Sequence, residues 1–76
     1  MRENHFIRYW TDLVGCDLNA ANLSVANLNE AILRGAKLNG AELSEAILGN
    51  AIVANEQLEQ ARSLQGAIMP DGSIYS

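Results

Sequence analysis

Four side chains in this sequence have the chemistry that enzymes and metal sites use: Cys16, His5, Asp12 and Asp17. A cysteine thiolate is a nucleophile where nearby positive charge lowers its pKa, and two neighbouring carboxylates can bind a metal ion or transfer protons. The chain has one cysteine and one histidine, which excludes an internal disulfide and a four-ligand Cys/His zinc site. No second ligand or acid/base partner is evident around His5, so we expect no catalytic or metal site there.

The elements that position these side chains follow a repeat of five residues. Leucine recurs at every fifth residue from Leu13 to Leu48, and Val53 continues the series. Two residues before each of these stands Thr11, Cys16 or an alanine, so nine pentads run without a gap over residues 11–55. Cys16 therefore occupies a small position that alanine fills elsewhere, and the repeat predicts an inward, unreactive thiol.

A period of five fits neither a helix nor a straight strand. Five residues advance roughly 500° around an α-helix, which spreads the leucines around its axis, and an odd period alternates between the two faces of a strand. The pattern is satisfied if the chain turns a corner after each pentad, with one leucine and one small residue pointing inward on every side. This predicts a narrow solenoid, although the spacing alone does not fix the number of sides.

The pentads resemble the pattern A-(D/N)-L-x-x of the pentapeptide-repeat proteins, a family abundant in cyanobacteria. Cys16-Asp17-Leu18-Asn19-Ala20 and Ala21-Asn22-Leu23-Ser24-Val25 show the match. The resemblance implies an all-β solenoid, a right-handed four-sided β-helix with four pentads per coil and about two coils. It also implies that the Asp or Asn before each leucine, including Asp12 and Asp17, bonds to the backbone of the turn.

The segments on either side of the repeats are expected to cover its ends. The sequence divides into residues 1–10, residues 11–55 and residues 56–76. After the repeats, Asn55 is a plausible N-cap for a short helix from Glu56 to Leu64 whose apolar face covers the last coil. Beyond it, Ala67 and Met69 restore the small-then-large spacing one residue out of phase, which predicts one further side of the coil.

Residues 1–10 leave two alternatives open. Phe6, Tyr9 and Trp10 stand at helical spacing, which favours a short capping helix over the first coil. The rival interpretation is an extended arm that docks on another chain.

Isoleucine occupies three outward positions at which most pentads have a polar residue. With four sides to a coil, Ile32 and Ile52 stack on one side and Ile47 lies on the neighbouring side. An apolar surface row favours contact with another protein or with a second copy. The alternatives are that the termini fold over it, or that isoleucine simply suits an outward strand position. The candidate interface residues are Ile32, Ile47, Ile52, Phe6, Tyr9 and Trp10.

Composition narrows the classes of function. Five basic and nine acidic residues give a net charge of −4, which disfavours a nucleic-acid-binding surface. No apolar run approaches the roughly 18 residues that span a bilayer, and no secretory signal is evident, so we expect a cytoplasmic protein without membrane contact. No phosphate loop, nucleophile–base pair or metal cluster is evident, so we expect no enzyme activity, cofactor or small-molecule substrate.

The sequence therefore favours a non-catalytic structural or protein–protein interaction module, with a homodimer as one form of it. The alternative rests on the resemblance, because some pentapeptide-repeat proteins are acidic rods that imitate DNA and bind type II topoisomerases such as gyrase. Nine pentads at four to a coil make 2.25 coils, which at about 4.8 Å spacing give a stack of roughly 11 Å, equal to about three base pairs at 3.4 Å each. Such a short rod disfavours DNA mimicry.

Overall fold

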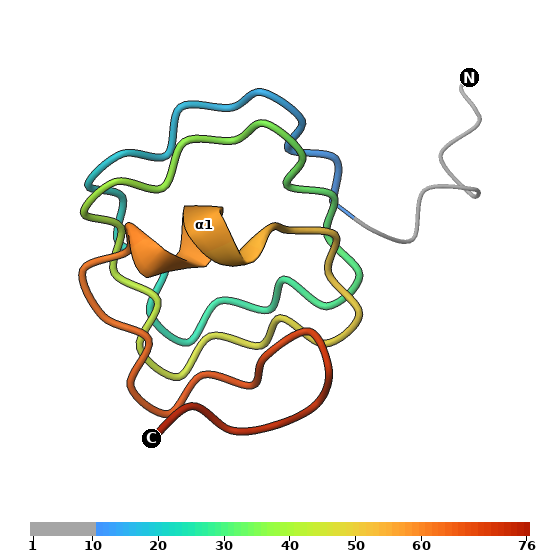
Figure 1. Cartoon of the computed structure of the whole chain (residues 1–76), viewed down its shortest axis with the longest axis vertical. Coiled ribbons are helices and arrows are strands. Elements are labelled where there is room, and N and C mark those ends of the chain that lie inside the picture. The colour runs from blue at the N-terminus through green and yellow to red at the C-terminus, as the bar shows by residue number, and fades with distance from the viewer. Residues whose placement is uncertain (1–10) are drawn as a thin grey trace.

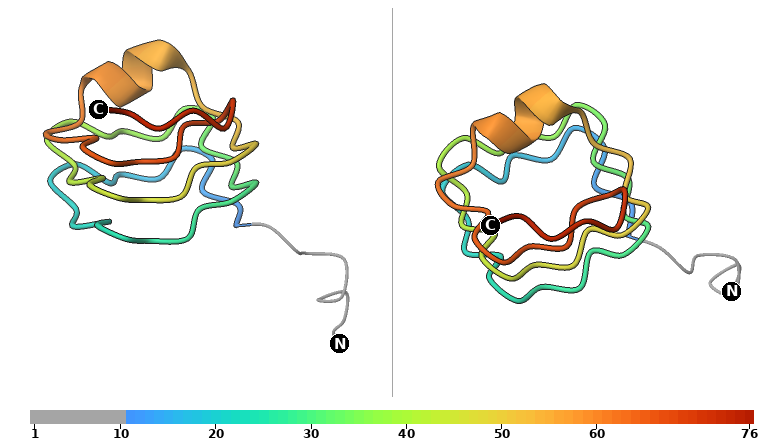
Figure 2. Two further views of the ribbon diagram at one scale, coloured as in Figure 1. Left: turned by 90° about the horizontal axis from the view of Figure 1, so that it is seen from below. Right: turned by 60° about the horizontal axis from the view of Figure 1, so that its bottom comes forward.

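The computed structural model describes residues 11–76, which form a square coil of stacked circuits with a short helix lying across one end (Figure 1, Figure 2). Each side of the coil is one pentad, and its second residue makes an isolated parallel bridge to the residue twenty positions later. Four pentads therefore complete one circuit. The bridges at this spacing are Asp12–Ile32, Asp17–Lys37, Asn22–Glu42, Asn27–Ile47 and Ile32–Ile52.

The four sides, numbered in chain order, are defined by the residues that stack through these bridges. Side 1 carries residues 12, 32 and 52, and side 2 carries residues 17 and 37. Side 3 carries residues 22, 42 and 63, and side 4 carries residues 27, 47 and 68. Side 4 leads directly into side 1 of the next circuit, so these two sides are neighbours along one edge of the coil.

Each corner is made by a residue with left-handed backbone. The fifth residue of every pentad from 15 to 50 has a φ between +57° and +74°, and the N–H of the following residue donates to the leucine carbonyl, as Cys16 does to Leu13 at 3.1 Å. This is the arrangement of a type II turn. Only glycine adopts it without steric cost, yet Val25 and Glu30 adopt it here at φ +64°.

Leucine and alanine columns fill the interior. Leu33, Leu38, Leu43 and Leu48 of the second circuit are the largest fully buried side chains, at 0–2 % exposure. The first circuit is less covered, and Leu13, Leu18 and Leu23 are only partly buried against this core. The alanines between the leucines, such as Ala31 and Ala41, have no exposed surface, because the tight corners leave no room for a larger group.

Helix α1 (Asn55–Glu59) replaces side 2 in the third circuit and is shorter than the sequence predicted. The expected N-cap Asn55 is the first helical residue, and Ala54 occupies the N-cap position with extended backbone. The helix ends early because the chain returns to the ladder of the coil: Gly40 donates to the carbonyl of Gln60, and Arg62 donates to that of Ala41. The predicted extension of the helix to Leu64 is therefore wrong.

After α1 the chain completes two more sides, where the sequence predicted one. Ser63 bridges to Glu42 and Ile68 bridges to Ile47, each at a spacing of 21 residues, so the helix and its exit add one residue to the circuit. Leu64, expected on the helix, instead packs in the core beneath the end of the stack. The predicted shift of one residue at Ala67 and Met69 is present and begins one side earlier.

The predicted N-terminal segment, residues 1–10 with Phe6, Tyr9 and Trp10, lies outside the described residues, as does His5. Within residues 11–76, no helix has the length and hydropathy that a bilayer crossing requires.

Candidate protein-interaction surface

Isoleucines stack in two columns on two neighbouring sides of the coil, and these four residues are here called the isoleucine face. Ile52 stacks on Ile32 on side 1, and Ile68 stacks on Ile47 on side 4. Ile52 is 47 % exposed, and the other three are half-buried by their neighbours in the column. In both columns the first circuit carries a polar residue, Asp12 or Asn27, so the apolar surface lies toward the end of the stack that bears α1.

The two remaining sides are polar. Side 2 stacks Lys37 on Asp17, and side 3 stacks Ser63 on Glu42 and Asn22. Glu42 is the acceptor for the Ser44 hydroxyl at 2.6 Å, and the Arg62 side chain lies 4.0 Å from its other carboxylate oxygen. Sides 1 and 4 therefore differ from sides 2 and 3 in the chemistry they offer to a partner.

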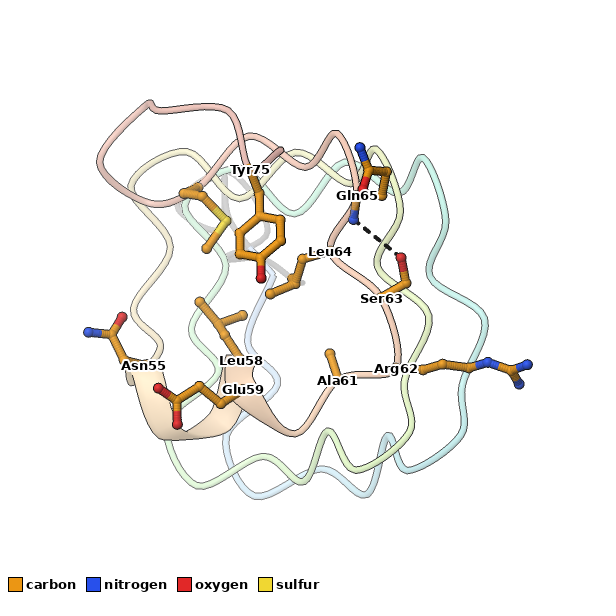
Figure 3. Close-up of a pocket in the computed structure, with 10 residues that line it drawn as sticks. Asn55, Leu58, Glu59, Ala61, Arg62, Ser63, Leu64, Gln65 and Tyr75 are labelled. Atoms are coloured by element: carbon orange, nitrogen blue, oxygen red, sulfur yellow. Dashed lines mark hydrogen bonds between the residues drawn. The ribbon is translucent and has the colours of Figure 1, made fainter.

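The end of the stack holds an open depression of about 550 Å³ between α1 and the last residues of the chain (Figure 3). Its apolar lining includes Leu58, Leu64 and Met69, and the ring of Tyr75 points toward Leu64 and Leu58 (Figure 3). The rim is polar and includes Glu59 and Arg62. We call this depression the end cup. Glu59 is the one carboxylate among the residues that line it, so the lining holds neither a pair of carboxylates nor a cluster of metal ligands.

Residues 72–76 turn back beside side 4 as a final antiparallel segment, in which Ile74 bridges to Ile68. The turn that reverses the chain is held by Asp71, whose carboxylate accepts hydrogen bonds from the Ser73 hydroxyl at 2.7 Å and from the Ser73 N–H at 3.0 Å. These two bonds lower the pKa of Asp71, the hydroxyl bond having the larger effect. Ile74 is 68 % exposed.

Cys16, Asp12 and Asp17, the potentially reactive residues of the repeat, occupy positions at which they support the coil. Cys16 is a free, half-buried thiol at a small inward position. The carboxylates of Asp12 and Asp17 accept hydrogen bonds from the N–H groups of Val14 and Asn19, at 3.2 and 3.1 Å. These bonds brace the turns, as the sequence predicted. Within residues 11–76, no three side chains of His, Cys, Asp or Glu come together where a metal ion could bind.

Comparison with known proteins identifies the repeat. A family model for pentapeptide repeats matches residues 11–61 with eight copies. The chain belongs to the pentapeptide-repeat family. No curated protein sequence matched the chain.

Among solved pentapeptide-repeat structures, the chain is similar to HetL from the cyanobacterium Nostoc sp. strain PCC 7120, a protein involved in the regulation of heterocyst differentiation. The two share 52 % identity, with a TM-score of 0.53 and a match that covers 84 % of this chain. The chain spans only 22 % of the length of HetL.

The spacing of the repeat predicted the positions of three members of the isoleucine face but not that of the fourth. Ile32, Ile47 and Ile52 lie on the sides that were predicted, while their role as an interface stays a prediction. Ile68 was overlooked because the extra residue at α1 moves it out of the main phase of the pentapeptide repeat. The small-then-large spacing of Ala67 and Met69 was the signal, since Ile68 lies between them in the outward position.

Proposed function

We propose that this pentapeptide-repeat chain is a non-catalytic protein–protein interaction module that binds its partner through the isoleucine face. The observation that carries the proposal is the stacking of Ile52 on Ile32 beside Ile68 on Ile47, which gathers apolar surface on two of the four sides. Isolated apolar residues are ordinary at protein surfaces, whereas apolar residues gathered in stacked columns beside polar sides favour a binding site.

The filled interior of the coil favours binding at the outer surface. The four leucines of the second circuit, including Leu38 and Leu48, fill the coil, so the described part of the chain has no room inside for a substrate. Flat outer sides built on a rigid coil suit recognition of another protein. The likeness to HetL, which is involved in the regulation of heterocyst differentiation, supports a regulatory role for the interaction. We further propose that α1 serves as the C-terminal cap of a right-handed coil.

DNA mimicry is less well supported by the surface. A mimic needs a continuous acidic stripe, but the outward columns alternate: Lys37 stacks on Asp17, and Arg62 lies beside Glu42. The two sides with isoleucine interrupt any acidic band around the coil. We therefore do not propose a topoisomerase partner.

The test is a photo-crosslinking residue introduced at position 52 in the protein expressed in its native host. We expect an adduct of discrete mass, which disappears when Ile32→Glu is added, because a buried charge at the centre of an apolar contact is costly. The matched control is the same crosslinker at position 37, on polar side 2. Glutamate already occupies the equivalent outward position at Glu42, so Ile32→Glu is compatible with the coil.

Two outcomes would overturn the proposal: the absence of any adduct from position 52, or the same adducts from positions 52 and 37. Circular dichroism of the purified Ile32→Glu protein, matched to the unsubstituted chain, checks that the loss of an adduct reflects the surface and not the fold.

A further inference from the structure

The last segment of the chain presents an open strand edge. The N–H of Tyr75 donates to the carbonyl of Ala67 at 2.8 Å, and the N–H of Met69 donates to the carbonyl of Ser73 at 2.7 Å, so the C=O of Ser73 and the N–H of Tyr75 point toward the coil. The N–H and C=O of Ile74, between them, point the other way and have no backbone partner among residues 11–76. Residues 73–76, here called the edge strand, also carry no charged side chain. An uncharged edge of this kind is a template for a further strand.

The end cup lies behind this edge. Alternate side chains of an added strand would point outward, beside Ile74, and inward, over Leu58 and Leu64. The ring of Tyr75, 46 % exposed, already points inward over these leucines (Figure 3). At about 550 Å³ the cup has space for large aromatic side chains. The edge and the cup together therefore fit a strand with bulky apolar residues on its inward face.

Charge adds a second requirement. Glu56 and Glu59 lie on α1 and Asp71 lies in the turn before the edge strand. The basic residues nearest to them among residues 11–76 are Arg62 and Arg34, which lines a depression with Ala54 and Gln57. Arg62 already lies beside Glu42. A partner segment with basic residues near its apolar ones would be favoured by this imbalance.

One segment of the chain itself has both properties. Residues 1–10 contain Phe6, Ile7, Tyr9 and Trp10, together with Arg2 and Arg8. They precede Thr11, which begins the first circuit, at the opposite end of the stack from the edge strand (Figure 2). Ten extended residues reach at most about 33 Å, which is enough to pair with the edge strand and to cross to the first circuit of a neighbouring molecule.

We propose that residues 1–10 of a second copy add to the edge strand and place aromatic side chains in the end cup, so that the chain associates head to tail. The neighbour's Thr11 then lies next to the end cup, and its first circuit continues the stack. Within one molecule the same residues would have to cross the outside of all the circuits first. This inference concerns the outer edge of the edge strand and the end cup, which adjoin the isoleucine face at Ile68 without being part of it. It holds whether or not that face binds a partner.

A head-to-tail contact joins two different surfaces, so it can be broken on either side and then restored by mixing. Ile74→Pro removes the outward N–H without touching a hydrogen bond within the chain, and proline is tolerated at such an edge. Phe6→Ser/Trp10→Ser removes the aromatic anchors of the other surface. Ile74→Val, which keeps the N–H and the branched side chain, is the matched control.

The measurement is the mass in solution by light scattering over a hundredfold range of concentration. We expect the unsubstituted chain and Ile74→Val to grow in mass with concentration, and the two disrupted variants each to associate at least tenfold more weakly. An equimolar mixture of the two disrupted variants retains one intact contact per pair. It should form dimers and grow no further.

Three results would overturn the proposal. If the unsubstituted chain stays monomeric throughout, residues 1–10 do not bind a second copy and instead contact their own molecule or another protein. Association that survives Ile74→Pro, or a mixture that stays monomeric, would exclude the head-to-tail contact. Failure here leaves the crosslink from position 52 unaffected, so the two proposals are tested separately.

Discussion

The side-chain amide of Gln57 donates a hydrogen bond of 2.8 Å to the main-chain carbonyl of Ala36, one circuit below it. The same Nε2 group donates to the carbonyl of Leu33 at 2.7 Å, while Oε1 accepts the N–H of Ala54 at 2.8 Å. In the other circuits a backbone N–H would serve the carbonyl at this position. One glutamine side chain thus replaces a missing rung of the ladder where α1 takes the place of side 2.

Removing this amide should destabilise the fold. Gln57→Ala leaves the carbonyl of Ala36 without its partner at a partly buried position, so we expect a loss of about 2–3 kcal/mol in the free energy of unfolding. Urea denaturation followed by circular dichroism measures the change. Gln60→Ala, on the exposed exit of α1, is the control and should change stability by less than about 0.5 kcal/mol. Equal effects of the two substitutions would contradict this role for Gln57.

The N-cap of α1 can be improved. Ala54 has the extended backbone of an N-cap, φ −84° and ψ 151°, but no side-chain acceptor for the first N–H groups of the helix. Ala54→Ser supplies an acceptor and completes a capping box with Gln57, so we expect a gain of about 0.5–1 kcal/mol. Ala54→Val, which has no acceptor, should give no gain. A shift in the urea midpoint measures both.

The corner at Val25 stores steric strain. A β-branched residue at φ +64° is unfavourable, and Val25 is 65 % exposed, so its side chain contributes little packing. We expect Val25→Gly to stabilise the fold by about 0.5–1 kcal/mol, after the added entropy of the unfolded chain is subtracted. Val14→Gly, at an exposed position just before a corner residue, should destabilise instead. Thermal unfolding of the two variants checks that the melting temperature rises for Val25→Gly and falls for Val14→Gly.

Truncation of a leucine in the second circuit should destabilise the fold more than truncation of one in the first circuit. Leu43 is 1 % exposed, whereas Leu23, directly below it on side 3, is only partly buried. Leu43→Ala should cost about 3–4 kcal/mol, because it removes buried apolar surface and leaves a cavity. Leu23→Ala should cost roughly half as much, since its surroundings already reach solvent. Similar losses in urea denaturation would mean that the first circuit is covered as well as the second.

The turn at Asp71 should weaken in acid. Its pKa is lowered by the Ser73 hydroxyl and N–H, so its contribution is present above the unfolded-state pKa of about 3.9 and is lost as the pH falls through the folded value. Ser73→Ala should raise the pKa of Asp71 toward its usual value, while Ser73→Thr keeps the hydroxyl and should not. NMR titration of the Asp71 carboxylate resolves the difference. An unchanged pKa in Ser73→Ala would show that the hydroxyl bond does not form in solution.

The repeat was predictable because one physical requirement recurs at every pentad. Each leucine and each small residue before it must face a narrow interior, so the spacing of Leu33 and Leu38 carries the same information as that of their neighbours. The role of Asp17 in bracing a turn was predictable for the same reason. The isoleucine positions on sides 1 and 4 followed once four pentads per circuit were assumed.

The end of the stack was less predictable, because there the backbone hydrogen bonds of a helix compete with the hydrogen bonds between circuits of the coil. Leu58, Ala61 and Leu64 have helical spacing, which predicts a longer helix. Leu64 is instead buried in the core on side 3, where the chain has already left α1. Gln57 gave no signal in the sequence, since the two carbonyls that its amide binds lie 21 and 24 residues earlier. Ile74 likewise has no repeat around it, and its exposure depends on a turn that Asp71 and Ser73 make locally.

The extra residue taken up at α1 has a consequence for how the length of this chain can vary. Bridges on either side of the helix keep their partners although the spacing changes from 20 to 21 residues. Within residues 11–50 a single insertion or deletion would turn every later leucine outward. Between Ala54 and Arg62 the coil would accommodate the change. In homologous sequences, single-residue insertions and deletions should therefore cluster at α1. Elsewhere in the repeats, length should change only by whole pentads.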